Sequence, residues 1–127
     1  MEGFSVKIRT ASKELSAKER VAIKDTSNCI SIDEATTNND KVIINYDYHV
    51  ILDIHNEHSD NKDYVKTVVV DKNGDKYVTG SQSFTTALVD IVDEMVEAGE
   101  GDNIQLQCYR KDSKNYKGKQ FITVSLI

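Results

Sequence analysis

Apolar and polar side chains alternate in Ile104-Gln105-Leu106-Gln107-Cys108-Tyr109, and they alternate again in Phe121-Ile122-Thr123-Val124-Ser125-Leu126. Successive side chains of a β-strand point to opposite faces, so a period of two is typical of strands with one buried face. We therefore predict a C-terminal antiparallel hairpin. Its inner face holds Ile104, Leu106, Cys108, Ile122, Val124 and Leu126, and its outer face holds Gln105, Gln107, Tyr109, Phe121, Thr123 and Ser125.

The segment between these strands, residues 110–119, is predicted to be a basic loop. It carries Arg110, Lys111, Lys114, Lys117 and Lys119 against one acid, Asp112, with Tyr116 between them. Cations neutralise phosphates and flat rings stack on unpaired bases, so this loop beside Tyr109 and Phe121 favours single-stranded nucleic acid as a ligand. The alternative is that the lysines only protect a sheet edge from association.

The longest strand signal runs from Val42 to Ile54, where every even position is apolar or aromatic. A strand of this length must coil, and coiled long strands close small barrels. Shorter strands are predicted at 4–9, 21–24, 29–32, 64–70 and 76–79, with a hairpin turn at Asn73-Gly74 before the last of them.

One amphipathic helix is predicted at about 83–98. Its apolar positions recur with helical spacing, at Phe84, Ala87, Leu88, Ile91, Val92, Met95 and Val96. Ser81 or Ser83 is expected to cap its start and Gly99 to end it. The outer face carries Asp90, Asp93, Glu94 and Glu97, which is either a docking site for other replication proteins or a solvated surface.

Strands, then one helix, then a closing hairpin is the order of elements in an OB-fold barrel. We therefore predict a mainly β, OB-like barrel of curled antiparallel strands, forming a single domain over residues 1–127 with one core. The extra N-terminal strands do not belong to a minimal OB-fold and are interpreted as an elaboration.

Charge is segregated along the chain although the net value is only −5. Residues 1–24 carry +3, residues 25–108 carry −12 and residues 109–119 carry +4. This pattern argues against a generic duplex-DNA protein with a basic body and favours a basic groove on an acidic one.

Several classes are disfavoured by composition. No segment resembles a membrane span or a signal peptide, so a cytoplasmic protein is expected. Cys29 and Cys108 lie in apolar patterns and are expected to be buried free thiols. No spacing supports a nucleophilic triad or a phosphate-binding glycine loop, so we predict no enzyme activity and no cofactor.

The most metal-like stretch is His55-Asn56-Glu57-His58 with Asp53 and Asp60 nearby. Its histidines do not have the spacing of a helical pair, so a polar loop is the favoured interpretation. A metal-dependent nuclease built from Asp47, Asp53 and Glu57 is left open as an alternative.

The stretches at residues 71–84 and 113–121, with the helix between them, resemble small single-stranded-DNA-binding proteins of tailed phages infecting Gram-positive bacteria. The matching residues are Asp71-Lys72-Asn73-Gly74-Asp75-Lys76-Tyr77-Val78-Thr79-Gly80-Ser81-Gln82-Ser83-Phe84 and Ser113-Lys114-Asn115-Tyr116-Lys117-Gly118-Lys119-Gln120-Phe121. The resemblance covers about residues 64–127 and implies an OB-fold and a role in phage replication or recombination. It implies contacts by the basic loop and Phe121. Bacterial-type relatives end in an acidic tail, whereas this chain ends in a predicted strand.

Together these observations predict a non-enzymatic protein that binds single-stranded DNA with little sequence preference. The expected contacts are Lys7, Arg9, Tyr109, Arg110, Lys111, Lys114, Tyr116, Lys117, Lys119 and Phe121. The first two are included if the first strand lies beside the hairpin. Other replication or recombination proteins are further candidate partners, and homo-oligomerisation is left open. The alternative is a phage-encoded inhibitor whose acidic surface mimics nucleic acid against a host nuclease.

Overall fold

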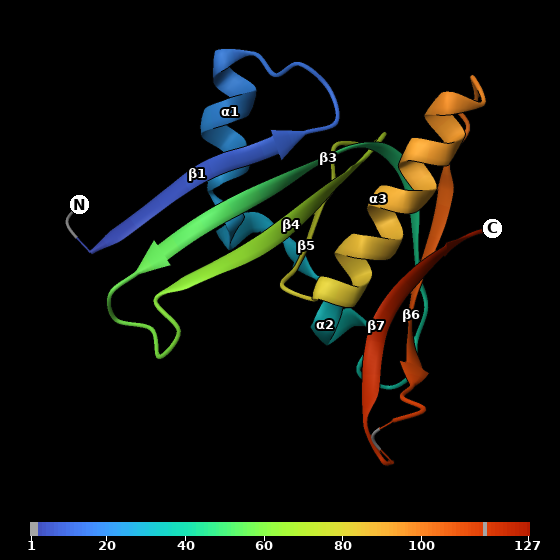
Figure 1. The fold of residues 1–127 in the computed structure, drawn as a ribbon. Coiled ribbons are helices and arrows are strands. Elements are labelled where there is room, and N and C mark those ends of the chain that lie inside the picture. The colour runs from blue at the N-terminus through green and yellow to red at the C-terminus, as the bar shows by residue number, and fades with distance from the viewer. Residues whose placement is uncertain (1–2, 116) are drawn as a thin grey trace.

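The computed structural model describes residues 3–115 and 117–127, and within them strands predominate (Figure 1). The strands are β1 (Phe4–Ala11), β2 (Ile30–Ser31), β3 (Val42–Asn56), β4 (Asp63–Asp71), β5 (Lys76–Thr79), β6 (Gln105–Asp112) and β7 (Gln120–Leu126). The helices are α1 (Ala17–Lys24), the short 3-10 helix η1 (Thr26–Asn28), α2 (Ile32–Ala35) and α3 (Gln82–Glu97). The prediction of a mainly β, OB-like fold is confirmed, with the sheet strongly curled into half a barrel.

The long strand β3 is the centre of the sheet, whose order is β2-β5-β4-β3-β6-β7 with β1 also paired to β3. Its first residues pair with β6, with Val42 opposite Cys108. Its later residues pair with β4 on one side and with β1 on the other, where Val6 lies opposite Ile54. Because one continuous strand serves both halves, the two halves of the sheet diverge around it, as Figure 1 shows.

A shift of register between Tyr46 and Tyr48 changes which side of β3 faces which core. Ile44 and Tyr46 are buried with the residues under α3, whereas Tyr48 and Val50 are buried in a second cluster that contains Ile23 of α1. A bulge of one residue reverses the alternation of a strand. The prediction that the even positions of 42–54 share one core is therefore wrong, and this strand is buried on both faces.

Helix α3 forms one of the two cores. Phe84, Leu88 and Val92 are buried against the inner face of the β6–β7 hairpin. The Ser81 hydroxyl accepts the Phe84 N–H as the N-cap, and Gly99, at φ 78°, follows the last turn. The predicted helix and both of its end signals are therefore confirmed, with the boundaries shifted by one residue.

The N-terminal third differs from the prediction at two short segments. Residues 21–24, predicted as a strand, belong to α1, because Ser16 and Glu19 form a reciprocal capping box that starts a helix there. Ile23 of this helix is buried in the second core. Of residues 29–32, only Ile30 and Ser31 form a strand, and they pair in parallel with β5.

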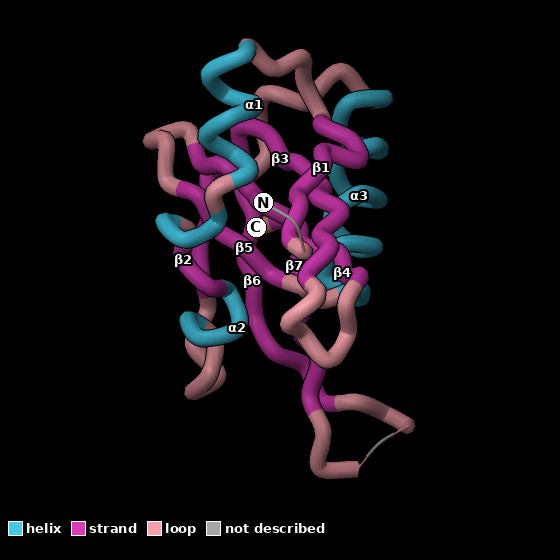
Figure 2. The backbone as a smooth tube through the Cα atoms, turned by 90° about the vertical axis from the view of Figure 1, so that its left-hand side faces the viewer, coloured by secondary structure: helices cyan, strands magenta, loops and turns pink. Residues whose placement is uncertain are grey.

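The two longest helices lie on opposite sides of the sheet. Figure 2 shows α1 and α3 on opposite sides of the strands, with the end of the β6–β7 hairpin extending away from the body. Ile32 of α2 is buried in the same core as Phe84 of α3. None of the helices in the described part of the chain is long and apolar enough to cross a membrane.

Candidate nucleic-acid interface

The β6–β7 hairpin has one buried and one open face. Leu106, Cys108 and Val124 are buried under α3, as the alternation predicts. On the opposite face Tyr109 lies across from Thr123, and Lys111 lies across from Phe121. Tyr109 and Phe121 are therefore diagonal neighbours, a relation that places residues about 7–8 Å apart.

The two rings on this face are accessible. Phe121 is 37% exposed and Tyr109 is half-buried. Exposed aromatic side chains on a pleated surface leave their faces open to a flat ligand. Two aromatic side chains at this spacing offer two neighbouring stacking positions.

Ile43 of β3 and Lys41, just before the strand, belong to the same face and were missed by the sequence prediction. Ile43 lies opposite Gln107 in the register and is 47% exposed, and the Nζ atom of Lys41 lies 5.7 Å from the centre of the Tyr109 ring. The signal was present in the sequence, because odd positions next to Ile44 must face away from its core. This alternation assigns Ile43 to the hairpin face only when the pairing of β3 with β6 is known.

The end of the hairpin carries most of the positive charge of this open face. Lys111, Lys114, Lys117 and Lys119 are all exposed. The Ser113 N–H donates to the carbonyl of Lys119 at 2.9 Å, which closes the base of the loop. Tyr116, a predicted contact, lies outside the described residues. We call Lys41, Ile43, Tyr109, Lys111 and Phe121, with the loop lysines Lys114, Lys117 and Lys119, the hairpin face.

Arg110 was predicted to contact phosphate, but in the structure it connects two elements of the fold. It has the parity of Leu106 and Cys108, so its side chain leaves the buried face of β6 toward α2. Its Nε donates to Thr36 Oγ1 at 3.2 Å and its Nη2 donates to the carbonyl of Asp33 at 2.7 Å. The sequence prediction ended the strand at residue 109, whereas β6 continues to residue 112.

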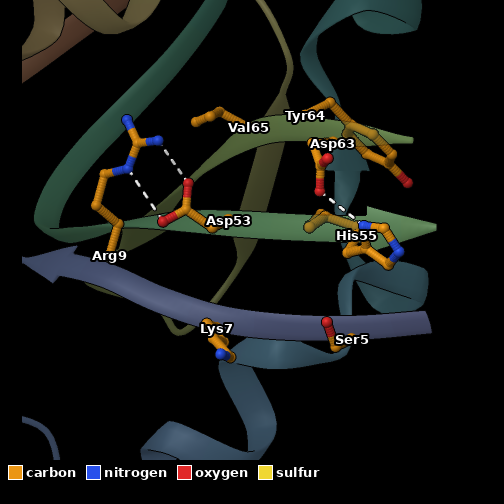
Figure 3. Close-up of a pocket in the computed structure, with 9 residues that line it drawn as sticks. Ser5, Lys7, Arg9, Asp53, His55, Asp63, Tyr64 and Val65 are labelled. Atoms are coloured by element: carbon orange, nitrogen blue, oxygen red, sulfur yellow. Dashed lines mark hydrogen bonds and ion pairs between the residues drawn. The ribbon is translucent and has the colours of Figure 1, made fainter. Parts of the chain in front are cut away.

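Lys7 and Arg9 were expected to contact DNA if the first strand lay beside the hairpin, but it does not. Strand β1 pairs with the far half of β3, where Lys7 is opposite Asp53. Val42, where β3 meets β6, is eleven residues from Asp53, roughly 36 Å along a strand. Arg9 is also engaged, since its guanidinium binds both carboxylate oxygens of Asp53 at 3.1 and 2.5 Å (Figure 3).

The surface around Arg9 is a depression of about 400 Å³ that also contains the predicted metal-like histidine. His55 Nδ1 lies 2.7 Å from Asp63 Oδ1 (Figure 3). Its Nε2 lies 2.5 Å from Glu57 Oε1. The hydrogen bond to Asp63 contributes most to raising the pKa of His55, and the hydrogen bond to Glu57 contributes next. Both ring nitrogens of His55 are held by carboxylates, whereas a metal needs a nitrogen whose lone pair is free.

The residues of the alternative nuclease site are not brought together. Asp47 lies at the bulge beside Tyr48, near α1, whereas Asp53 is bound to Arg9 and Glu57 to His55 on the other side of the sheet. Among residues 3–115 and 117–127, no group of three or more histidine, cysteine or acidic side chains is placed to hold a metal ion.

The two thiols are free and sit in separate cores. Burial raises the pKa of Cys108 to about 12 and raises the pKa of the half-buried Cys29. Reactive cysteines require the thiolate, so neither residue is suited to nucleophilic chemistry at neutral pH. The prediction of buried thiols holds fully for Cys108 and in part for Cys29.

Comparisons of this chain with protein-family models, with curated proteins and with solved structures found no match.

Proposed function

We propose that this protein binds single-stranded DNA through the hairpin face, with little sequence preference. The observation that carries the proposal is the diagonal pair of accessible rings, Tyr109 and Phe121, bordered by Lys41 and Lys111 on an open sheet surface. A base–aromatic stack contributes about 1–3 kcal/mol, and the π-face is common to all bases. The setting that the sequence resemblance implies is phage DNA replication or recombination.

The polar side chains of this face support weak sequence preference. Gln105 donates its amide to Asn45 Oδ1 at 2.9 Å, and Gln107 donates its amide to Ser125 Oγ at 3.1 Å. Reading a base edge requires side chains whose donors and acceptors are available to it. Here some of the hydrogen-bond donors and acceptors of Gln105 and Gln107 are already paired within the sheet, so we expect stacking and charge to dominate the interaction.

The charge distribution supports a strand-shaped ligand. The end of the hairpin extends away from the body (Figure 2), and its loop carries the exposed residues Lys114, Lys117 and Lys119. A strand whose bases stack on Tyr109 and Phe121 would therefore have cations along its continuation. Residues 25–108 carry −12, which disfavours phosphate contact across most of the central part of the chain. A short, localised basic surface fits one flexible strand better than a rigid duplex.

The proposal is tested by fluorescence anisotropy with labelled single-stranded DNA, duplex DNA and RNA of equal length. We expect the single strand to bind more tightly than the duplex, and several unrelated sequences to bind with similar affinity. Equal or stronger binding of the duplex, or an absence of binding at low salt, would reject it. The RNA arm determines whether the sugar matters.

A second function is favoured by one observation. Asp90, Asp93, Glu94 and Glu97 of α3 are exposed, and the last turn of that helix contains no basic residue. Acidic side chains at a helix C-terminus oppose the macrodipole, so this surface would gain from a cationic partner. A phage inhibitor that mimics nucleic acid would present such a surface. Nuclease-treated host lysate passed over the immobilised protein tests it, with Asp93→Asn/Glu97→Gln as the matched negative variant and inhibition of the captured nuclease as the readout.

A further inference from the structure

A second concave surface lies on the side of the sheet that carries α1. It is a groove of about 570 Å³ between α1 and the start of β1, and its apolar lining includes Phe4, Val21, Ile54 and Tyr64. We call it the α1 groove. It exists because α1 has eight residues, roughly 12 Å of helix, whereas β3 beneath it has fifteen residues, roughly 50 Å of strand. The helix therefore leaves one end of the sheet uncovered.

The groove has accessible aromatic and aliphatic surface. Phe4 is 41% exposed, Val21 is 75% exposed and Tyr64 is half-buried, while Ile54 forms a buried floor. Phe4 and Val6 extend along the same face of β1. Large apolar side chains gathered at one exposed place are typical of a binding surface rather than of a solvated one.

The border of the groove is positively charged. Lys24 and Lys66 line it, and α1 also carries the exposed residues Lys18 and Arg20. The one acid of α1, Glu19, is bound by Lys13 at 3.0 Å. Asp25 also lines the groove, and its carboxylate accepts hydrogen bonds from the Ser27 N–H and hydroxyl. Of the basic residues in 1–24, Lys24 therefore lines this groove, whereas Lys7 and Arg9 line the separate depression beside Asp53.

The α1 groove and the hairpin face lie on the same side of the sheet. Ile43 faces away from α3, and after the bulge at residue 47 the even positions of β3, including Ile54, face away from α3 as well. Figure 2 agrees, because α1 lies on the opposite side of the strands from α3. The two surfaces are separated by the eleven residues from Ile43 to Ile54, roughly 36 Å along the strand.

We propose that the α1 groove is a second binding site for single-stranded nucleic acid, in which bases stack on Phe4 and Tyr64 and phosphates contact Lys24 and Lys66. Aromatic side chains in a basic groove are the general means of holding an unpaired strand. This inference rests on the proposed function in one respect, because both assume that the ligand is single-stranded nucleic acid. A long strand engages both surfaces, and a short one engages one surface at a time.

The test compares two oligothymidylates of about 8 and about 30 nucleotides, the first within and the second beyond the roughly 4–16 nucleotides that one small single-strand-binding domain covers. Lys24→Gln/Lys66→Gln removes the cations, and Phe4→Ser removes one ring. The matched control, Lys7→Gln/Lys62→Gln, removes the same charge at two lysines that do not line the groove. We expect the double groove variant to flatten the salt slope for the long strand by about 1.4, two phosphates at 0.7 each, while the control leaves it unchanged.

A positional readout accompanies the affinities. Photocrosslinking to a bromodeoxyuridine-substituted long strand, followed by mass spectrometry, is expected to label peptides that contain Phe4 or Tyr64. Groove variants that behave like the control, together with an absence of those crosslinks, would overturn the proposal. It is overturned equally if the groove variants change the mass of the protein in sedimentation but not its DNA binding, because the groove is then a contact between copies.

The two proposals fail separately in this design. If Tyr109→Ala/Phe121→Ala leaves binding intact while the groove variants weaken it, the hairpin face is wrong and the groove stands. If the hairpin variant weakens binding of both strands and the groove variants weaken neither, the groove is wrong and the hairpin face stands. A wild-type protein that binds no oligonucleotide at low salt rejects both.

Discussion

Lys41, just before β3, and Tyr109 of β6 are more than 60 residues apart in sequence, yet the lysine Nζ lies 5.7 Å from the ring centre. A cation at this distance from an aromatic face is attracted by the ring quadrupole, within the roughly 6 Å limit of such contacts. The contact holds a positive charge beside an accessible ring. A phosphate could therefore be neutralised next to the base that stacks on Tyr109, which makes the pair the centre of the hairpin face.

The first prediction concerns stacking. Tyr109→Ala and Phe121→Ala should each weaken single-strand binding by about 1–3 kcal/mol, because each removes one base–aromatic stack. Isothermal titration with an oligothymidylate measures the loss. Val96→Ala is the control, since Val96 is an exposed apolar residue of α3, 60% accessible, outside the hairpin face. Ring variants that bind like this control, or that lose folding and not affinity, would contradict the prediction.

The second prediction concerns salt. Four exposed lysines, Lys111 of β6 with Lys114, Lys117 and Lys119 of the loop, remain as phosphate contacts. Together they should give a slope of about −2.8 in log affinity against log salt. Lys114→Gln/Lys117→Gln should flatten it by about 1.4, with similar losses for every base sequence.

The control for the salt prediction is Lys62→Gln/Lys72→Gln, which makes the same change of net charge away from the loop. Thermal unfolding should barely distinguish the loop variant from wild type, because exposed substitutions cost less than about 0.5 kcal/mol. A slope unaltered by the loop variant would remove the loop from the binding site.

Local patterns were sufficient for most strands and for α3. Alternation in β6 and β7, the Asn73-Gly74 turn and the helical stripe of α3 each depend on neighbouring residues, so a single sequence carries them. Residues 21–24 were mispredicted although a local signal existed, since Ser16 and Glu19 have capping-box spacing. The apolar residues of that short segment fit a strand equally well.

The bulge in β3 had no comparable signal. Tyr46-Asp47-Tyr48 continues the alternation without a glycine or an interruption, and the change of face arises from pairing with β4. Membership of the candidate site depends on the same long-range pairing. It adds Lys41 and Ile43 to the hairpin face, and it places Lys7 and Arg9 on a different strand pair.

The third prediction separates a structural residue from a binding residue. Arg110→Ala removes the hydrogen bonds to Thr36 Oγ1 and the Asp33 carbonyl. Hydrogen bonds from a charged donor contribute about 1.5–3 kcal/mol when buried, and partial exposure lowers this, so we expect a loss of about 1 kcal/mol in urea unfolding. The salt slope of DNA binding should stay unchanged. Arg110→Lys is the companion variant that keeps the charge. If it restores the slope but not the stability, Arg110 contacts phosphate after all.

The fourth prediction concerns pH and the two histidines of β3, whose pKa values shift in opposite directions. Burial lowers the pKa of His49, which is 6% exposed and whose Nδ1 lies 2.7 Å from the Tyr46 hydroxyl, although Asp93 partly opposes the shift. Hydrogen bonds to Asp63 and Glu57 raise the pKa of His55. For His49 the unfolded chain takes up a proton more readily than the folded one. Its contribution to the free energy of unfolding is therefore intact above its unfolded pKa of about 6.5 and declines as the pH falls below it.

For His55 the sign is reversed. Its stabilising contribution is complete below about pH 6.5 and is lost as the pH rises through its raised folded pKa. Urea unfolding across the range of about pH 5 to 8 measures both effects. His49→Gln should reduce the loss of stability on acidification, and His55→Gln should increase it, because each variant leaves the other histidine to act alone. Variants with pH profiles parallel to wild type would show that neither histidine changes its proton affinity on folding. Profiles shifted in the same direction would show that one of the two environments differs in solution.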